Sequence, residues 1–321
     1  MRLSRGLPAR PVAGFIVLGV GVLCLALVPL VHWYVLPRVE VLPLDENTTS
    51  VSTGRGTYID QATGKPVGPT TLTVTTHVLG DVAAGEATGY AVWNISTTVD
   101  TPDSLRKRDP RRSLDWTLER WVGDRRTDQP VACCGASPHF DGNAYVKFPF
   151  NVAKGTYDFW NPKARQAFPV RYTGTADVGG LRLYRFQGTV PPTKIGSTQV
   201  PGTLVGLRSS AMTDVDEWYR DTGTEIDVDP LSGIPVVTVQ HTVTTFRLPG
   251  SGTDRLTVLA ATFTTDRASR DTLVALVKDT DQKLTLVQRT LPMVLLAGGS
   301  VLVVVGAMLV VVAVRRSRRT A

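Results

Sequence analysis

The sequence predicts a mainly β (α+β) extracytoplasmic domain flanked by two transmembrane helices. Two observations lead to this fold class. Apolar runs without Asp, Glu, Lys or Arg lie near both ends of the 321-residue chain and are long enough to cross a bilayer. Between them, short runs alternate apolar and polar residues and are separated by turn residues, as in antiparallel sheets. We therefore expect a curved antiparallel sheet or a partial barrel with one packed amphipathic helix.

The first apolar run, Pro11–Leu36, predicts transmembrane helix 1. Its apolar core is longer than the roughly 7–15 residues of a signal-peptide core, and no cleavage site of the A-x-A kind follows it. We interpret the run as an uncleaved anchor. Three arginines precede it, and basic residues gather on the cytoplasmic side of a membrane, so residues 1–10 are predicted to form a cytoplasmic tail.

The second run, Leu291–Val314, predicts transmembrane helix 2. At about 1.5 Å of rise per residue it covers the roughly 30 Å of hydrocarbon in a bilayer. Only a helix satisfies its own backbone groups there. Four arginines follow within residues 315–321, which predicts a second cytoplasmic tail. Residues 37–290 then form the extracytoplasmic domain of a two-pass protein of the cell membrane.

The charge distribution agrees with this topology. Seven of the 35 Lys and Arg lie in the two predicted tails, so the segment between them holds 28 basic residues and all 28 acidic residues. The net charge of +7 therefore belongs to the tails, and the predicted domain is electroneutral. The basic composition thus indicates membrane topology, and we expect no nucleic acid as a partner.

Short alternating runs predict the strands of the sheet. The predicted strands are Thr70–Val78, Tyr90–Val99, Leu114–Val122, Pro130–Ala132, Ala144–Phe150, Pro169–Tyr172, Leu181–Gly188, Asp216–Arg220, Glu225–Val228, Ile234–Leu248 and Arg255–Thr264. Leu36–Thr49, which contains two prolines, is interpreted as an extended stalk. The amphipathic helix is predicted at Arg267–Val287. Its apolar stripe consists of Leu273, Leu276, Val277, Thr280, Leu284 and Val287. We expect it to pack on the sheet; the membrane surface is the alternative.

The sequence contains no recognisable catalytic or metal-binding motif. The four histidines are scattered, and neither a nucleophile elbow nor a phosphate-binding glycine loop is present. We predict a protein that is not an enzyme, with no catalytic residues, metal or cofactor. Seven acids crowd one stretch: Asp214, Asp216, Glu217, Asp221, Glu225, Asp227 and Asp229. Their spacing misses the EF-hand pattern, so we expect solvated strand faces and turns. An envelope hydrolase or transferase has only this stretch in its favour.

Cys133 and Cys134 are the two cysteines of the predicted domain. Neighbouring Cα atoms lie about 3.8 Å apart, below the usual minimum of about 4.4 Å for a disulfide. A bond between them would be strained, yet the domain offers no other partner on the oxidising side. The alternatives are a vicinal disulfide and two free thiols, and we favour the disulfide. As its role, a rigid turn is favoured over a redox-labile clip.

Two further stretches are candidate binding sites. Five aromatic residues fall within thirteen positions of a chain that is only 7% aromatic: Phe148, Phe150, Tyr157, Phe159 and Trp160. They either plug the core beneath a loop or line an apolar pocket for a lipid. The densest basic run consists of Arg106, Lys107, Arg108, Arg111 and Arg112. It is a weaker candidate for contact with anionic head groups, each charge contributing on the order of 1 kcal/mol near an acidic surface. A solvated loop balanced by nearby acids is the alternative.

Along essentially its whole length the chain resembles the actinobacterial PorA-type two-pass membrane proteins. The resemblance rests on Phe148-Pro149-Phe150 with Thr156-Tyr157 and Trp160, on Tyr172-Thr173-Gly174 with Leu183-Tyr184-Arg185-Phe186, and on Val228-Asp229-Pro230 with Gly233 before the closing helix. It implies the two-span topology, a role in the cell envelope and, as in some relatives, an apolar cavity that carries lipid or lipoglycan intermediates. Porin activity fits poorly, because the outward strand positions are Thr, Asn and Ser instead of a lipid-facing apolar band.

These observations lead to two main hypotheses. In the first, the domain binds or hands on an envelope lipid or lipoglycan intermediate. In the second, the protein has no ligand and is a structural or scaffolding protein that holds other envelope membrane proteins together. A buried apolar cavity of lipid size would favour the first hypothesis, and a solid core the second.

Overall fold

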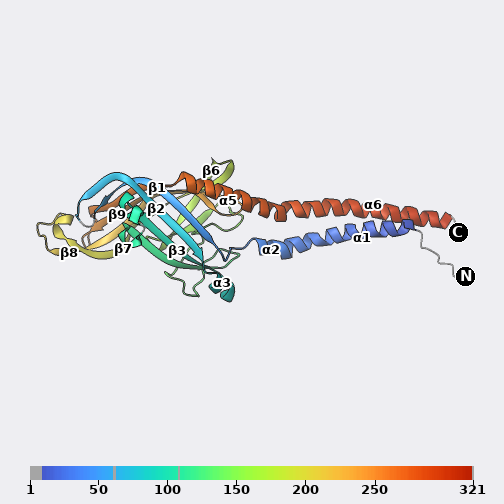
Figure 1. Cartoon of the computed structure of the whole chain (residues 1–321), viewed down its shortest axis with the longest axis horizontal. Coiled ribbons are helices and arrows are strands. Elements are labelled where there is room, and N and C mark those ends of the chain that lie inside the picture. Colours follow the sequence, from blue (N-terminus) through green and yellow to red (C-terminus); the bar gives the residue numbers. More distant parts are fainter. Residues whose placement is uncertain (1–8, 61–62, 108, 320–321) are drawn as a thin grey trace. The chain divides into compact units, whose positions relative to one another are not determined.

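A computed structural model describes residues 9–60, 63–107 and 109–319 (Figure 1). The chain divides into two compact units. The helical unit comprises the residues up to Val41 and those from Thr280 onwards, and the β unit comprises Leu42–Asp279.

The helical unit contains the two apolar runs. The first run forms α1 (Ala9–Leu30), a π-helical turn (Val31–Val35) and α2 (Leu36–Val39). The second forms a π-helical turn (Leu286–Thr290) and α6 (Leu291–Arg319). Val12–Val39 and Arg267–Arg316 each contain a window with a mean hydropathy of 2.7, long and apolar enough to cross a membrane. Many of their large apolar side chains are exposed, as expected of helices that face lipid.

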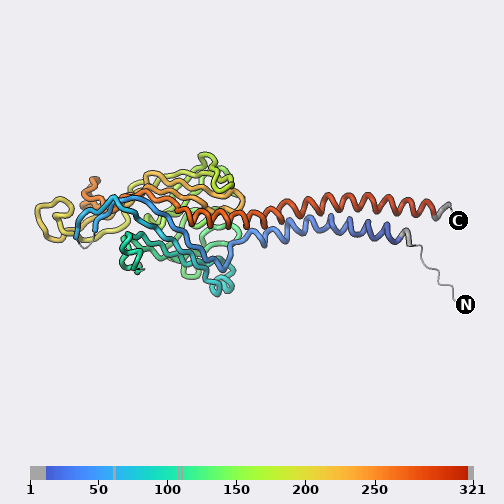
Figure 2. The backbone as a smooth tube through the Cα atoms, turned by 45° about the horizontal axis from the view of Figure 1, so that its top comes forward, coloured from blue at the N-terminus to red at the C-terminus, as the bar shows by residue number. Residues whose placement is uncertain are grey.

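Helices α1 and α6 lie side by side and antiparallel (Figure 2). Glycines allow the close approach of the two backbones. A Cβ atom added to Gly21 would lie 2.7 Å from the Val303 nitrogen, and one added to Gly306 would lie 2.5 Å from the Leu18 nitrogen. Gly19, by contrast, has no atom within 4 Å of such a Cβ. The helix contact therefore depends on particular glycines.

We expect Gly21→Leu to force α1 and α6 apart, because the leucine side chain would need the space that the α6 backbone occupies. Gly19→Leu is the matched control: it makes the same change in helix propensity on the same helix, with open space around it. Distances between spin labels on the two helices, measured in lipid nanodiscs, should lengthen in the first variant alone. Equal distances in both variants would contradict the helix contact.

The β unit is built on one ten-stranded antiparallel sheet in the order β4-β3-β2-β1-β10-β9-β8-β7-β6-β5. The strands are β1 (Asn47–Ile59), β2 (Pro66–Gly80), β3 (Ala91–Asp100), β4 (Asp115–Gly123), β5 (Thr156–Asn161), β6 (Gln166–Val178), β7 (Leu181–Pro201), β8 (Met212–Val228), β9 (Pro235–Arg247) and β10 (Asp254–Thr265). The sheet curls into a half-barrel, visible in Figure 1. The prediction of a curved antiparallel sheet or partial barrel is confirmed.

Short helical elements connect several strands. They are α3 (Val82–Thr88), α4 (Pro102–Lys107) and the 3₁₀ turns Pro110–Arg112 and Gly202–Val205. Helix α5 (Arg267–Thr285) follows β10, and the Asp266 carboxylate accepts a hydrogen bond from the Ser269 amide at 2.7 Å to cap its start. Val274 and Val277 pack against Leu183 and Val236 of the sheet. The predicted helix is confirmed as a helix packed on the sheet, but Val274, rather than the 38% exposed Leu276, lies in its buried stripe.

The two edge strands, β4 and β5, are linked by the irregular residues 124–155, which we call the seam segment. It pairs with β4 through single bridges at Arg120–Ser137 and Gly123–Pro130, and with β5 through one at Ala144–Phe159. Further along, the Phe148 amide donates to the Gly233 carbonyl, in the turn between β8 and β9, at 2.8 Å. The seam segment thus spans the opening between the sheet edges.

Several strand predictions are wrong. Pro130–Ala132 and Ala144–Phe150 form only isolated bridges. In the second range Pro149 has no amide to donate, and the Phe148 amide bonds to a turn. The stalk predicted to be extended over Leu36–Thr49 begins as helix α2 and ends in β1, whose Thr, Ser and Gly give little apolar signal. Strand β5 was not predicted. The two short strands predicted at residues 216–228 form one strand, β8, with a shift of register between Asp221 and Glu225.

Candidate functional site

The five aromatic candidates occupy three different surroundings. Phe148 is buried, and the centres of the Tyr157 and Phe159 rings lie 5.0 and 5.9 Å from its ring centre. Trp160 is buried in a neighbouring cluster, 4.9 Å from the Phe140 ring. Phe150 is half-buried, and its ring lies 3.7 Å from the ammonium group of Lys147. Four of the five rings therefore pack in the core at the seam, and lipid contact by them stays a prediction.

A buried carboxylate, Glu119, joins the two sheet edges to the seam segment. Only 4% of this β4 residue is exposed. Its carboxylate accepts hydrogen bonds from the hydroxyl of Tyr145 and from the indole nitrogen of Trp160, the latter at 3.1 Å. Burial raises the pKa of Glu119 above its ordinary value. Burial and the nearby Glu119 charge raise the pKa of Tyr145 well above its ordinary value.

Glu119→Gln is expected to remove a pH dependence of stability and to keep the fold. The glutamine oxygen accepts from Trp160, and its NH₂ group donates to the Tyr145 oxygen. A raised pKa gives the folded protein a stabilising contribution that is complete below the unfolded value of about 4.5 and is lost as pH rises through the folded pKa. As pH rises from about 4.5 through the folded pKa of Glu119, the free energy of unfolding of the natural protein should therefore fall relative to that of Glu119→Gln.

Urea unfolding in detergent between about pH 4 and about pH 8 measures this difference. Glu119→Leu is the control: it leaves the Tyr145 hydroxyl and the Trp160 N–H unpaired, at a cost of about 1–3 kcal/mol for each group. Parallel pH profiles of stability for the natural protein and Glu119→Gln would contradict a raised pKa of Glu119 in the folded protein.

A buried ion pair lies within the seam segment. The Lys147 Nζ and Asp128 Oδ2 atoms are 2.7 Å apart, and the two side chains are 12% and 3% exposed. Burial raises the pKa of Asp128 and lowers that of Lys147, in both cases because it disfavours the charged form. The other carboxylate oxygen of Asp128 is buried and has no hydrogen-bond partner among the described residues. This pair was not predicted, since its members lie nineteen residues apart in irregular chain.

The basic candidates belong to the connection between β3 and β4. Arg108 is outside the described residues. Arg106 and Lys107 belong to α4, and both make ion pairs with Asp103. The Arg111 Nε atom lies 3.0 Å from an Asp109 oxygen. Nearby acids thus balance much of this exposed run, as in the solvated-loop alternative. Head-group contact stays a prediction.

The acidic stretch differs from its prediction. Asp216, Asp221, Asp227 and Asp229 are buried, not solvated. Arg185 binds Asp227 through two hydrogen bonds, of 2.7 and 2.8 Å. The other buried acids each have their own partners: a lysine for Asp216, backbone amides for Asp221, and Ser232 for Asp229. Within the described ranges, no group of three or more His, Cys, Asp or Glu is placed to hold a metal ion.

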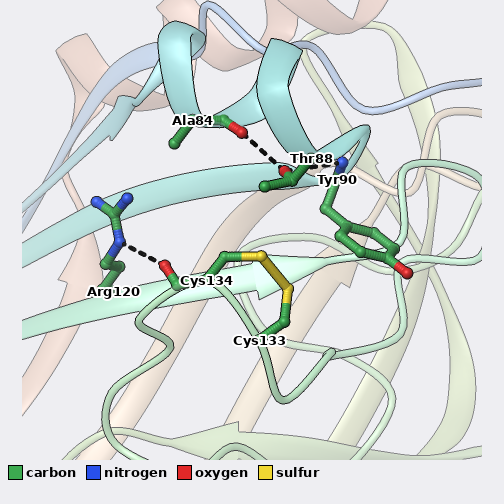
Figure 3. The surroundings of a disulfide bond; sticks show 6 residues. All are labelled: Ala84, Thr88, Tyr90, Arg120, Cys133 and Cys134. Carbon is green, nitrogen blue, oxygen red and sulfur yellow. Dashed lines mark hydrogen bonds between the residues drawn. A yellow bond between two sulfur atoms is a disulfide. The ribbon is translucent and has the colours of Figure 1, made fainter.

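A hollow of the β unit lies at the seam segment. Its volume is about 480 Å³, and it is lined by residues 130–136 with His139 and Phe140. Cys133 and Cys134 form a disulfide in its wall (Figure 3). A small void of about 10 Å³ shares Pro130 and Phe140 with the hollow. That void is also lined by Asp128, Tyr145 and Trp160, so the hollow adjoins the buried polar groups described above.

Arg120 of β4 holds the disulfide turn in place. Its Nε atom donates to the Cys134 carbonyl at 3.2 Å, as Figure 3 shows, while its other nitrogens bond to Asn94 and Asp81. The sequence drew attention to the cysteines but not to Arg120 or the hollow. The only available signal was a charged residue inside a predicted strand, which is also common on exposed faces.

Comparison with known proteins gives consistent matches. A family model described as "Porin PorA" matches residues 13–308. A protein of Corynebacterium resistens named "Porin PorA" is 26% identical over 221 residues, covering 56% of this chain and 52% of the relative. Another "Porin PorA", from Corynebacterium amycolatum, is 20% identical over 292 residues, covering 69% of this chain and 74% of the relative. The chain thus spans about half the length of the first relative.

Proposed function

This chain belongs to the PorA porin family, and from that premise we propose a two-pass protein of the cell membrane whose β unit binds or hands on an envelope lipid or lipoglycan intermediate. Family membership and two apolar helical segments make it a membrane protein. The proposed orientation places both termini in the cytoplasm. Arginines beyond both apolar runs support it, as does the disulfide of the β unit, because disulfides persist in oxidising compartments.

Single-cysteine variants test this topology in a background that lacks the three natural cysteines. A cysteine at the exposed Thr63, in the β1–β2 turn, should react with a membrane-impermeant maleimide in intact cells. A cysteine at Ser317 should react only after the membrane is opened. The reverse pattern, or reaction at both sites in intact cells, would refute the two-pass orientation.

One observation carries the binding proposal: an aromatic interior lies behind a seam made of irregular chain. Phe148, Tyr157, Phe159 and Trp160 supply the interior. Single bridges, in place of a continuous strand ladder, join the seam segment to β4 and β5. Displacing irregular chain costs fewer backbone hydrogen bonds than separating paired strands. A lipid tail would therefore enter at the seam and replace ring–ring contacts with its own.

Photocrosslinking distinguishes binding from anchoring alone. We expect a photoreactive phospholipid in nanodiscs to label peptides within residues 147–160 as well as α1 and α6. Phe150→Ser should reduce the first labelling, because the Phe150 ring is half-buried and belongs to neither of the packed clusters that hold the other four rings. Ser137→Ala, at an exposed seam position, is the control. Labelling confined to α1 and α6 would refute lipid binding by the β unit.

The close packing of Phe148 and Trp160 favours the second candidate, a scaffold of an envelope complex, and restriction of the lipid label to the helices would support it.

The relatives' name also points to a channel. Against a pore-forming barrel, the outward face of β2 carries Thr71, Thr73, Thr75 and His77, a polar row where a barrel strand needs apolar residues. Single-channel recordings in planar bilayers test that activity directly.

A further inference from the structure

We propose that the Cys133–Cys134 disulfide is a thiol-exchange site, at which a low-molecular-weight thiol enters the adjoining hollow and attacks the sulfur of Cys134. Exchange at this site does not require that the β unit binds lipid.

Access to the disulfide is open. Cys134 is exposed and Cys133 is half-buried, so we expect an incoming thiol to meet the Cys134 sulfur first. The bond lies in the wall of a hollow of about 480 Å³, within the range of roughly 300–1,000 Å³ that small-molecule sites occupy. Exchange rates depend on which sulfur can be reached, so the attack is directed to Cys134.

The exchange balances with thiol as the only co-reactant. The thiol gives its proton to the imidazole of His139, which lines the same hollow, and its thiolate attacks the Cys134 Sγ atom. The disulfide breaks, and its electron pair goes to the Cys133 Sγ atom, which takes the proton from the imidazolium. The products are a mixed disulfide on Cys134 and a thiol on Cys133. A second thiol attacks the sulfur of the bound adduct, so that two thiols are oxidised to their disulfide and Cys133 and Cys134 are both reduced.

The turn has supports that do not depend on the disulfide. Arg120 and Ser137 exchange two backbone hydrogen bonds, of 2.7 and 3.0 Å. The Arg120 side chain bonds to the Cys134 carbonyl, and its guanidinium also makes an ion pair with Asp81 at 2.8 Å. The Ala136 amide donates to the Cys133 carbonyl at 2.8 Å. We therefore expect the turn to keep its place when the bond opens, which makes exchange reversible in the folded protein.

An adduct on Cys134 would occupy the hollow. Because the hollow shares Pro130 and Phe140 with the void beside Asp128, Tyr145 and Trp160, the adduct would close this approach to the interior of the seam. The ratio of small thiols to their disulfides around the protein would thus determine whether the hollow is open.

The first test uses full-length Cys24→Ser protein in nanodiscs, with reduced glutathione as the probe and alkylation with mass spectrometry as the readout. We expect two alkylated thiols at Cys133 and Cys134, at a rate within about tenfold of that in urea-unfolded protein. Unchanged tryptophan fluorescence would show that the fold persists. A disulfide that resists glutathione until the protein unfolds, or two free thiols before any reductant is added, would overturn the proposal.

The second test compares how readily a small sulfur reagent reaches Cys134 and Cys133. In the Cys24→Ser background, Cys133→Ser leaves the exposed Cys134, and Cys134→Ser leaves the half-buried Cys133. With glutathione disulfide, Cys134 should gain one glutathione about tenfold faster than Cys133 does. Equal rates, or no adduct in either variant, would overturn the assignment of Cys134 as the more accessible sulfur. His139→Ala should slow the reduction of the natural disulfide about tenfold, with rescue by added imidazole, and an unchanged rate would refute the role of His139.

Discussion

Lys147→Met is expected to lower the free energy of unfolding of the β unit by about 3–5 kcal/mol. The variant removes the ammonium group that lies 2.7 Å from Asp128 and leaves a carboxylate whose side chain is only 3% exposed. An uncompensated buried charge is much more costly than an absent ion pair. Urea unfolding of the full chain in detergent, followed by tryptophan fluorescence, provides the measurement.

The matched control is the double variant Lys147→Met with Asp128→Asn. Asparagine suits this position because Asp128 has a φ of 58°, a left-handed conformation that asparagine tolerates better than most side chains. Since the double variant has no buried charge, it should recover most of the lost stability. If the double variant is as unstable as Lys147→Met, the cost comes from lost packing around the lysine stem and the charge argument fails.

Trp160→Ala is expected to cost about 3–5 kcal/mol of stability. It opens a cavity beside Phe140 and Tyr145 and takes away the indole donor of the buried Glu119. Trp116→Ala is the control, because it removes the same side chain from a position that is 47% exposed. Its cost should be about 1 kcal/mol or less.

This comparison also separates the two interpretations of the aromatic stretch. If Trp160 is a core residue, its loss destabilises the protein whether or not lipid is present. A small cost for Trp160→Ala, similar to that for Trp116→Ala, would contradict the core placement and favour a side chain that lines open space. Chemical unfolding of both variants under the same conditions decides between them.

The sequence predicted the sheet better than the seam. In β2 apolar and polar residues alternate, and its partners β1 and β3 are its neighbours along the chain, so the local pattern suffices. In β4 the pattern misleads: Trp116 and Leu118 are exposed, while Glu119 on the opposite face is buried. The burial of Glu119 is explained by Trp160 and Tyr145, which come from β5 and the seam segment. Such tertiary partners cannot be read from the periodicity of one strand.

The candidate residues show the same limit. Aromatic density correctly drew attention to residues 148–160, but composition cannot distinguish rings that pack on one another from rings that line a pocket. The ion pair of Asp128 and Lys147 lies in irregular chain, and so does the disulfide turn to which Arg120 is hydrogen-bonded. Irregular chain has no sequence period from which such contacts could be predicted. The adjacent cysteines were visible, and the hollow beside them was not.

The strand order has a consequence for folding. Each neighbouring pair in the sheet joins strands that are consecutive in the chain, except β1 and β10. Strands β1–β4 and β5–β10 can therefore each form by pairing strands that follow one another in the chain, whereas the β1–β10 pair must close a loop that contains all the others. The chain enters β1 soon after α2 and leaves β10 into α5. Contact between α1 and α6 would bring the two ends of that loop together in advance, so the glycines of the helix pair would influence how fast the sheet closes.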